Sequence, residues 1–195
     1  MPKITNIKYG NTNTYLIHGT NGSLLIDTDY AGTLSSFFRT IKSLGIKVSD
    51  ITYIIATHYH PDHIGLVGEL VDMGIKLAII DTQYKYVHFS DKIFERDNIY
   101  NYKSIKENEA LLIKCEESRG FLRSIGIEGE IISTVSHSED SISLILDSGE
   151  CFVGDLEPIE YLSTYENNEK LKADWEKINK FKIENINYSH IGTRK

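Results

Sequence analysis

Three histidines and one aspartate lie within six consecutive positions of the segment Thr57-His58-Tyr59-His60-Pro61-Asp62-His63-Ile64-Gly65. The segment directly follows residues 51–56, an apolar run that predicts a buried β-strand. Imidazole nitrogens suit zinc, copper, iron and nickel, and a neighbouring carboxylate adds an oxygen ligand. The segment therefore predicts a metal site at the end of a strand.

The length and composition of the chain predict an ordinary globular protein. Its 195 residues can bury a full core, and no low-complexity segment divides them, so we expect one domain over residues 1–195. No run approaches the roughly 18 apolar residues of a membrane span, and the first residues lack the apolar part of a signal peptide. We therefore expect a cytoplasmic protein without membrane contact, and no feature predicts an oligomeric state.

The net charge argues against some classes of partner, and the cysteine count argues against thiol chemistry. A formal net charge of −7 makes the average surface repel phosphate backbones, so nucleic acid is disfavoured and a small-molecule substrate is favoured. The two cysteines, Cys115 and Cys151, are too few for a disulfide framework. Cys151 lies in an apolar run that predicts a buried, inert thiol. Thiol chemistry is not expected.

Strands and helices are predicted along the whole chain from hydrophobic periodicity and turn residues. The predicted strands are residues 4–7, 13–18, 23–29, 51–56, 75–80, 130–135, 141–147, 150–153 and 183–188. The predicted helices are residues 31–44, 64–73, 109–124 and 169–181, with a weaker helical signal at 83–88. Residues 91–108 are polar and contain Tyr100 and Tyr102. They predict an insertion that could cover a site, although we expect the tyrosines to serve in packing.

Further ionisable residues follow other predicted strands. Asp27, His137, Asp155 and His190 each come at the end of a predicted strand. Strand ends of α/β proteins carry ligand sites because their loops vary while the sheet holds them rigidly. The two remaining histidines, His18 and His88, have no acidic or histidine neighbours in the sequence and are predicted to be structural or surface residues.

The number of potential ligands exceeds the needs of one metal ion. His58 and His60 are two positions apart and can project the same way, whereas Pro61 is suited to open a helix that points Asp62 and His63 elsewhere. Zinc takes about four ligands, and a catalytic zinc keeps one position open. Two metal ions therefore fit the set better. Two divalent ions roughly 3.5–4 Å apart form a hydrolytic centre that generates a nucleophile at neutral pH.

These motifs together resemble those of the metallo-β-lactamase superfamily. The segment from His58 to His63 is similar to its HxHxDH signature, and the other four motifs of that family are an Asp, a His, an Asp and a His. Their counterparts occur in order along nearly the whole chain, as Asp27, His137, Asp155 and His190. The last motif departs from the family pattern. It commonly reads His-Gly, whereas here Ile191 stands between His190 and Gly192.

The resemblance implies a fold and a ligand set. The fold would be of the α/β class, also grouped as α+β, with two mixed sheets flanked by helices in a four-layer αββα sandwich. The first metal would be held by His58, His60 and His137, and the second by Asp62, His63 and His190. Asp155 would bridge them, and Asp27 would support the ligands from behind.

The resemblance also implies a reaction. Two divalent ions, zinc first and iron or manganese as alternatives, would share a bridging hydroxide that attacks an ester, thioester, lactone, amide or phosphoester. Asp62 would help to orient the hydroxide. The expected function is hydrolysis of a small ester-, thioester- or lactone-like metabolite. The alternatives are an iron-dependent dioxygenase of thiol persulfides and a non-catalytic ligand sensor on the same scaffold.

Within the superfamily, the retained His63 and Asp155 resemble glyoxalase II, the lactonases or the RNase Z group more than true β-lactamases. The chain ends five residues after His190, which disfavours glyoxalase II proper. The acidic charge and short length disfavour RNase Z, and Pro158 replaces a tyrosine common in quorum-quenching lactonases. Flavodiiron-type reductases normally carry Glu where His60 stands, and no flavin domain follows. A compact hydrolase of the glyoxalase II or lactonase type is therefore expected.

Overall fold

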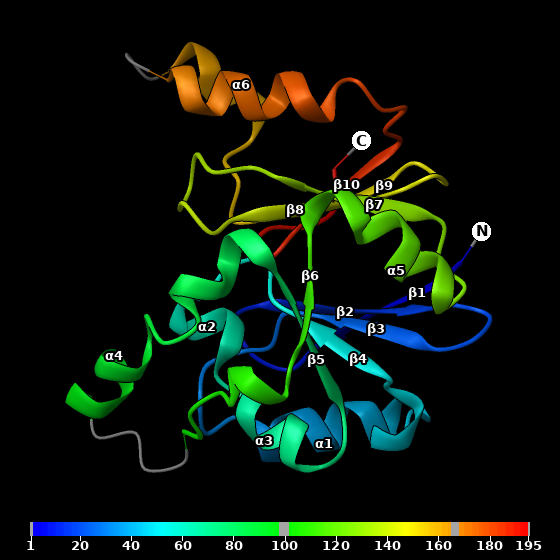
Figure 1. Cartoon of the computed structure of the whole chain (residues 1–195), viewed down its shortest axis with the longest axis vertical. Coiled ribbons are helices and arrows are strands. Elements are labelled where there is room, and N and C mark those ends of the chain that lie inside the picture. Colours follow the sequence, from blue (N-terminus) through cyan, green and yellow to red (C-terminus); the bar gives the residue numbers. More distant parts are fainter. Residues whose placement is uncertain (1, 98–101, 165–167, 195) are drawn as a thin grey trace.

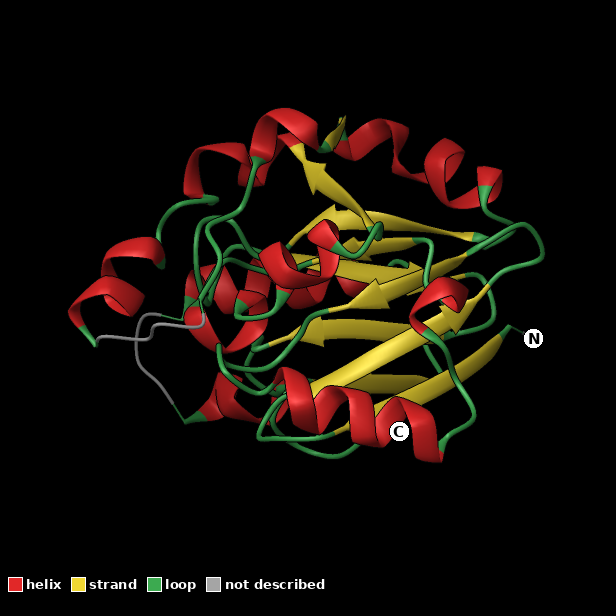
Figure 2. Ribbon diagram, turned by 90° about the horizontal axis from the view of Figure 1, so that it is seen from below, coloured by secondary structure: helices red, strands yellow, loops and turns green. Residues whose placement is uncertain are grey.

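Two β-sheets face each other, and helices cover the outer face of each (Figures 1 and 2). This arrangement is seen in a computed structural model that describes residues 2–97, 102–164 and 168–194. From bottom to top of Figure 1 the layers are α1 and α3, the first sheet, the second sheet, and α6. The predicted αββα sandwich is confirmed.

The first sheet follows the chain order. Its strands are β1 Lys3–Lys8, β2 Asn13–His18, β3 Ser23–Ile26, β4 Tyr53–Ile55, β5 Lys76–Ile80 and β6 Leu111–Ile113, and they neighbour one another in that sequence. The β1–β2 and β2–β3 pairs are antiparallel, whereas β3 to β6 are parallel. Parallel strands place their carboxyl ends at one edge, so the ends of β3 and β4 deliver their loops to the same place.

The second sheet is formed by the last third of the chain. Its strands are β7 Gly129–Ser133, β8 Ile142–Leu146, β9 Glu150–Gly154 and β10 Asn185–Tyr188, in the order β10-β9-β8-β7. The β8–β9 hairpin is antiparallel as predicted, and β10 returns parallel to β9. The carboxyl ends of β9 and β10 therefore lie side by side. Both sheets are mixed, as expected.

Six α-helices and five short 3₁₀ segments connect the described strands. The helices are α1 Leu34–Ser43, α2 Pro61–Ile64, α3 Val67–Asp72, α4 Asp91–Arg96, α5 Ser118–Ser124 and α6 Glu169–Ile178. The 3₁₀ segments are Val48–Asp50, Asp81–Tyr86, Glu107–Glu109, Cys115–Glu117 and Ile159–Ser163. None of the described helices is long and apolar enough to cross a bilayer.

Three apolar clusters hold the four layers together. One lies between α1, α3 and the first sheet, one between the two sheets, and one between the second sheet and α6. Strand β4 contributes to two of them, because Ile54 packs in the first cluster and Ile55 in the second. Burial of both faces explains why residues 51–56 are almost continuously apolar. This anchored strand supports the histidine segment that follows it.

The predicted helix at 109–124 is wrong in its first half. Residues Leu111–Ile113 form β6, which pairs with β5 at the end of the sheet, and only Ser118–Ser124 is α-helical. Leu112 and Cys115 fitted a helical spacing, but a three-residue edge strand is too short to show its own period of two. Within the predicted helix at 64–73, Val67–Asp72 forms α3, whereas Ile64 is the last residue of α2. The weak signal at 83–88 falls on a 3₁₀ segment, Asp81–Tyr86.

The polar segment at 91–108 begins with helix α4. Tyr102 stacks on the buried Phe94 with ring centroids 4.0 Å apart, and its hydroxyl donates to Asp91 at 2.6 Å. It therefore serves in packing, as expected, whereas Tyr100 lies outside the described residues. Cys151 is buried, and burial raises the pKa of its thiol to about 12, which agrees with the predicted inert role.

Candidate metal centre

The structure brings all seven predicted ligands to one edge of the two sheets. His58 and His60 follow β4, and Asp62 and His63 lie in α2, which Pro61 opens as predicted. The other three come from the second sheet, where His137 lies in the β7–β8 loop, Asp155 follows β9 and His190 follows β10.

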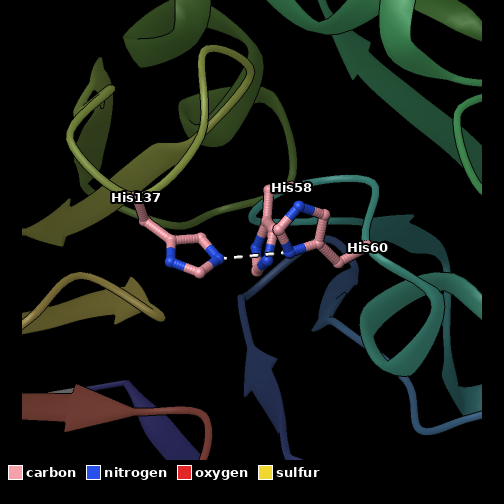
Figure 3. Close-up of side chains that lie close together, drawn as sticks. All are labelled: His58, His60 and His137. Carbon is pink, nitrogen blue, oxygen red and sulfur yellow. Dashed lines mark hydrogen bonds between the residues drawn. The ribbon is translucent and has the colours of Figure 1, made fainter.

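The first group of side chains is a histidine trio from two segments. Ligand atoms of His58, His60 and His137 lie within 4.8 Å of one another. Figure 3 shows the three rings converging, with Nε2 of His137 3.1 Å from Nδ1 of His60. Three imidazoles with an open position are a donor set that zinc takes in catalytic sites.

The second group adds a carboxylate. Ligand atoms of Asp62, His63 and His190 also lie within 4.8 Å of one another, and Nε2 of His190 is 3.2 Å from Oδ2 of Asp62. His63 is completely buried, whereas Asp62 and His190 are more than a third exposed. Two histidines and one carboxylate suit zinc and also non-haem iron.

Asp155 lies between the two trios. Its Oδ2 is 3.9 Å from Nε2 of His58, 3.4 Å from Nε2 of His63 and 3.8 Å from Nε2 of His137. Its Oδ1 is 3.3 Å from Nε2 of His190. One carboxylate thus faces ligand nitrogens from both groups, which is the position that a bridging ligand requires.

Orphaned polar atoms test whether the site suits metal ions. Nε2 of His58, Nε2 of His63 and Oδ1 of Asp155 are buried and have no hydrogen-bond partner among the described residues. Buried polar atoms without partners are rare in native proteins, because each costs about 1–3 kcal/mol. A bound cation would satisfy all three. The donor set and the orphaned atoms therefore both fit a metal centre.

The protons on the two buried histidines can be assigned from their neighbours. The Thr57 hydroxyl donates to Oδ2 of Asp27 at 2.8 Å, so it can only accept from Nδ1 of His58, 3.1 Å away. Nδ1 of His63 lies 2.9 Å from the same Asp27 carboxylate and donates to it. In both rings Nε2 is then the atom left to face the site, as metal-ligating histidines usually require.

Asp27 connects four segments behind the ligands. Besides His63, its carboxylate accepts from the Thr57 backbone N–H at 2.6 Å and from the Ser189 hydroxyl at 3.1 Å. It is 1% exposed, and its φ of 59° lies in the left-handed region, which Asp tolerates better than most residues. The carboxylate thus links the ends of β3 and β4 to α2 and to the segment that carries His190.

Asp140 and Gln83 were not predicted as site residues, yet both fix the first trio. The Asp140 carboxylate accepts from the Tyr59 N–H at 2.6 Å and from the Ser138 hydroxyl at 2.7 Å. Tyr59 lies between His58 and His60, and Ser138 follows His137. Gln83 donates to the carbonyl groups of Ala56 and Asp140, at 3.0 and 3.1 Å. Both side chains are buried.

A buried carboxylate on α6 holds the His137 loop from its other side. Asp174, 1% exposed, accepts from the Ser136 N–H at 2.7 Å and from the Lys177 ammonium at 2.9 Å. Lys177 in turn donates to the Ser133 carbonyl at 2.9 Å. The loop between β7 and β8 is therefore held at both ends by hydrogen bonds to buried carboxylates.

We expect alanine at Asp140 to weaken metal binding at the histidine trio by about tenfold or more. The substitution leaves the buried Tyr59 N–H unpaired and frees the His137 loop from the His58–His60 segment. Asp140→Asn is the matched control, because its carbonyl can still accept from Tyr59 and its amide can donate to Ser138. The absorption of bound cobalt during titration measures the affinity. Equal cobalt affinity in the alanine variant and the native protein would contradict the assignment.

In the absence of metal, the histidines of the two trios differ in their pKa. Burial lowers the pKa of His58 and of His137, so both are neutral near pH 7. The nearby carboxylates of Asp155 and Asp62 raise the pKa of His190 to about 10. Burial opposes a positive charge on His63, but Asp27 and Asp155 outweigh it and raise its pKa to about 10. A metal at the second trio must therefore displace protons.

We predict that the second zinc binds with a much steeper pH dependence than the first. Each displaced proton weakens binding about tenfold for every unit of decreasing pH. As the pH falls, binding at the second trio should therefore be lost before binding at the first. Calorimetric titration in buffers of different ionisation enthalpy counts the protons released. Two zinc ions that bind with the same pH dependence would contradict the prediction.

His18 and His88, the two remaining histidines, lie outside the candidate metal centre, in a structural and a surface position respectively. His18 contacts the Thr5 hydroxyl at 3.4 Å, in a structural position on β2. His88 is at the surface, as predicted, but it does have acidic neighbours, because its ring nitrogens lie 2.9 Å from Asp91 and from Glu107. Hydrogen bonding to Asp91 and Glu107 raises the pKa of His88. The sequence did not reveal this contact because Glu107 is 19 residues away.

Comparison with known proteins agrees with this architecture. The profile of the metallo-beta-lactamase superfamily matches residues 7–184. The solved structure of a metallo-beta-lactamase family protein from Thermus thermophilus aligns with a TM-score of 0.71 over 99% of this chain and 73% of that chain. The two sequences are 18% identical, so the likeness concerns the fold.

Two curated relatives match parts of the chain. The flavo-diiron protein FprA2 of Clostridium acetobutylicum is 29% identical over 109 residues, which cover 55% of this chain and 26% of that protein. The beta-lactamase-like protein 2 homolog of Caenorhabditis elegans is 26% identical over 155 residues, 74% of this chain and 45% of that protein. The matched region thus spans less than half of either relative.

Proposed function

The chain belongs to the metallo-beta-lactamase superfamily, and we propose that it is a dinuclear metal-dependent hydrolase of a small ester-, thioester- or lactone-like molecule. The observation that supports this function best is the position of Asp155, whose two carboxylate oxygens face histidine nitrogens of both trios at 3.3 to 3.9 Å.

The proposed ligand roles follow the two trios. His58, His60 and His137 would hold the first ion, Asp62, His63 and His190 the second, and Asp155 would bridge them. Zinc is the favoured metal, because three imidazoles suit it and the second trio adds a carboxylate. Two such ions would supply a hydroxide at neutral pH and polarise the bond under attack.

The protein's own groups would orient the reactants. Asp62 is 39% exposed, so its carboxylate can reach a water molecule at the opening of the site. A hydrogen bond with His190 lowers the pKa of Asp62, which keeps the carboxylate ionised and able to accept a hydrogen bond from that water. Asp27 would fix the His63 ring so that Nε2 faces the site. Metal-ligand histidines commonly depend on such partners.

A second candidate function is an iron-dependent oxidoreductase, such as a persulfide dioxygenase. The trio of Asp62, His63 and His190 has the two-histidine, one-carboxylate composition typical of non-haem iron oxygenases. The similarity to a flavo-diiron protein points the same way. His60 favours the hydrolase, because it gives the other trio a third imidazole ligand.

Metal content and a substrate panel together test the proposal. The purified protein is analysed for bound metals, loaded with zinc, and assayed on esters, thioesters, lactones and phosphodiesters. About two zinc ions per chain with turnover of an ester, thioester or lactone would support the hydrolase. One or two irons with oxygen consumption would overturn it in favour of the oxidoreductase. Full zinc loading without any turnover would overturn it in favour of a ligand sensor.

A further inference from the structure

A cavity of about 270 Å³ opens beside the proposed metal centre. Three of the residues that line it are His137, Asp155 and His190, so a molecule held at the centre can extend directly into it. The volume lies just below the range of about 300–1,000 Å³ that is typical of small-molecule sites. The cavity therefore accommodates one arm of a small substrate.

The far wall of the cavity is apolar and preformed. It consists of Leu156, Pro158, Tyr188 and Ile191, from the segments that follow β9 and β10. Leu156 and Tyr188 are 2% and 3% exposed and belong to the apolar cluster beneath α6. Apolar walls that are already fixed bind apolar groups without a cost of ordering.

Side chains of two other elements donate hydrogen bonds to the backbone of both segments. The Trp175 indole donates to the Glu157 carbonyl at 2.9 Å, and the Asn13 amide donates to the Tyr188 carbonyl at 2.9 Å. Because these partners come from α6 and β2, the wall is supported by both halves of the protein.

Among the described lining residues, the one charged side chain outside the proposed ligand set is acidic. Glu157 is exposed and lines the cavity, and no lysine or arginine is among its described lining residues. Arg194 lies over the Tyr188 ring, with its guanidinium 5.9 Å from the centroid, but it pairs with Glu160 at 3.6 Å and does not line the cavity. A carboxylate placed beside Glu157 would be repelled by it and partly desolvated by the apolar lining residues.

We propose that this cavity is the subsite for the acyl arm of the substrate, and that it selects short, apolar, uncharged acyl groups over acyl groups that end in a carboxylate. The assignment rests on the proposed hydrolase function. It adds Glu157 and Ile191 as residues that determine specificity, Ile191 by apolar contact and Glu157 by repulsion of anions. Neither residue belongs to the proposed ligand set.

A pair of matched thioesters tests the selectivity. Butanoyl and 3-carboxypropanoyl thioesters of N-acetylcysteamine share the leaving group and the four-carbon acyl chain, and only the second ends in a carboxylate. We expect the zinc-loaded protein to favour the butanoyl thioester by about tenfold or more in kcat/KM. Each methylene added from acetyl to butanoyl should raise kcat/KM by up to about fourfold.

A binding measurement separates this inference from the proposed reaction. Butanohydroxamate and 3-carboxypropanohydroxamate carry the same metal-binding group on four-carbon chains, so calorimetry on the zinc-loaded protein compares the arms without turnover. We expect the uncharged compound to bind about tenfold more tightly. If hydroxamates discriminate in this way but no thioester is cleaved, the subsite stands and the hydrolase does not. Equal or tighter binding of the carboxylated compound, or binding of neither, would overturn the subsite.

Charge reversal at the wall provides the matched variants. Glu157→Lys should reduce the discrimination between the two hydroxamates by about threefold or more, because the repulsion becomes attraction. Glu176→Lys makes the same change of net charge on the exposed side of α6, away from the cavity, and should leave the discrimination unaltered. An identical change in both variants would assign the effect to overall charge and overturn the role of Glu157.

Discussion

Alanine in place of Asp155 should abolish hydrolysis and reduce bound zinc from two ions to at most one. Asp155 is the one carboxylate among the described ligand candidates that faces both trios, so its loss removes an oxygen from each proposed ion. Loss of a direct ligand should exceed the roughly 10- to 100-fold effects on metal affinity that outer partners of ligands produce, so we expect more than about 100-fold weaker binding of the second zinc.

Metal analysis and calorimetric titration measure the loss, and circular dichroism checks that the fold is intact. Asp155→Asn keeps the shape of the side chain but removes its charge, and it should also lose the second zinc. His88→Ala removes an exposed histidine that lies outside both trios and should keep two zinc ions. An Asp155→Ala protein with two tightly bound zinc ions and native turnover would contradict the bridging role.

The sequence predicted the layers because the elements that form them have clear periods. Residues 51–56 are apolar on both faces, and the structure buries Ile54 and Ile55 in different clusters. The hairpin of β8 and β9 has alternating residues and a Ser148-Gly149 turn. By contrast, β6 is a three-residue strand at the sheet edge, too short for a period, and was mistaken for part of a helix.

The ligand candidates could be predicted from the sequence because histidines and aspartates recur at the ends of predicted strands. His137 and Asp155 are far apart in the sequence, yet both follow strands of the second sheet and meet at its edge. The assignment of each to a particular metal ion stays a prediction, and so does the closeness to glyoxalase II or the lactonases.

The supporting residues were not predictable from one sequence. Asp140, Gln83 and Asp174 are single polar residues whose partners are backbone groups of distant segments. The Asp140 carboxylate and the Tyr59 N–H are 81 residues apart. No sequence spacing or composition marks such contacts. An aspartate in a polar loop is normally interpreted as a turn residue. Only the packing of the β7–β8 loop against the histidine segment reveals them.

Alanine at Asp27 should lower the free energy of unfolding of the metal-free protein by about 3–5 kcal/mol. The carboxylate is 1% exposed and accepts from Thr57, Ser189 and His63, so its removal leaves buried donors unpaired. It would also leave the His63 charge without its nearest buried partner. Alanine tolerates the φ of 59° less well than aspartate, which adds strain.

Urea unfolding at pH 7 measures the effect, with metal removed so that lost ligand binding does not contribute. Asp27→Asn separates the causes, because asparagine accepts left-handed backbone and keeps one carbonyl acceptor but cannot balance a charged His63. We expect its free energy of unfolding to lie between those of the native protein and the alanine variant. The Thr57 N–H and Nδ1 of His63 bond different oxygens of Asp27, and asparagine keeps only one of them. Asp27→Asn should therefore also bind the second zinc about 10- to 100-fold more weakly. Stability of Asp27→Ala within about 1 kcal/mol of the native protein would show that Asp27 is not the link between the two halves of the site.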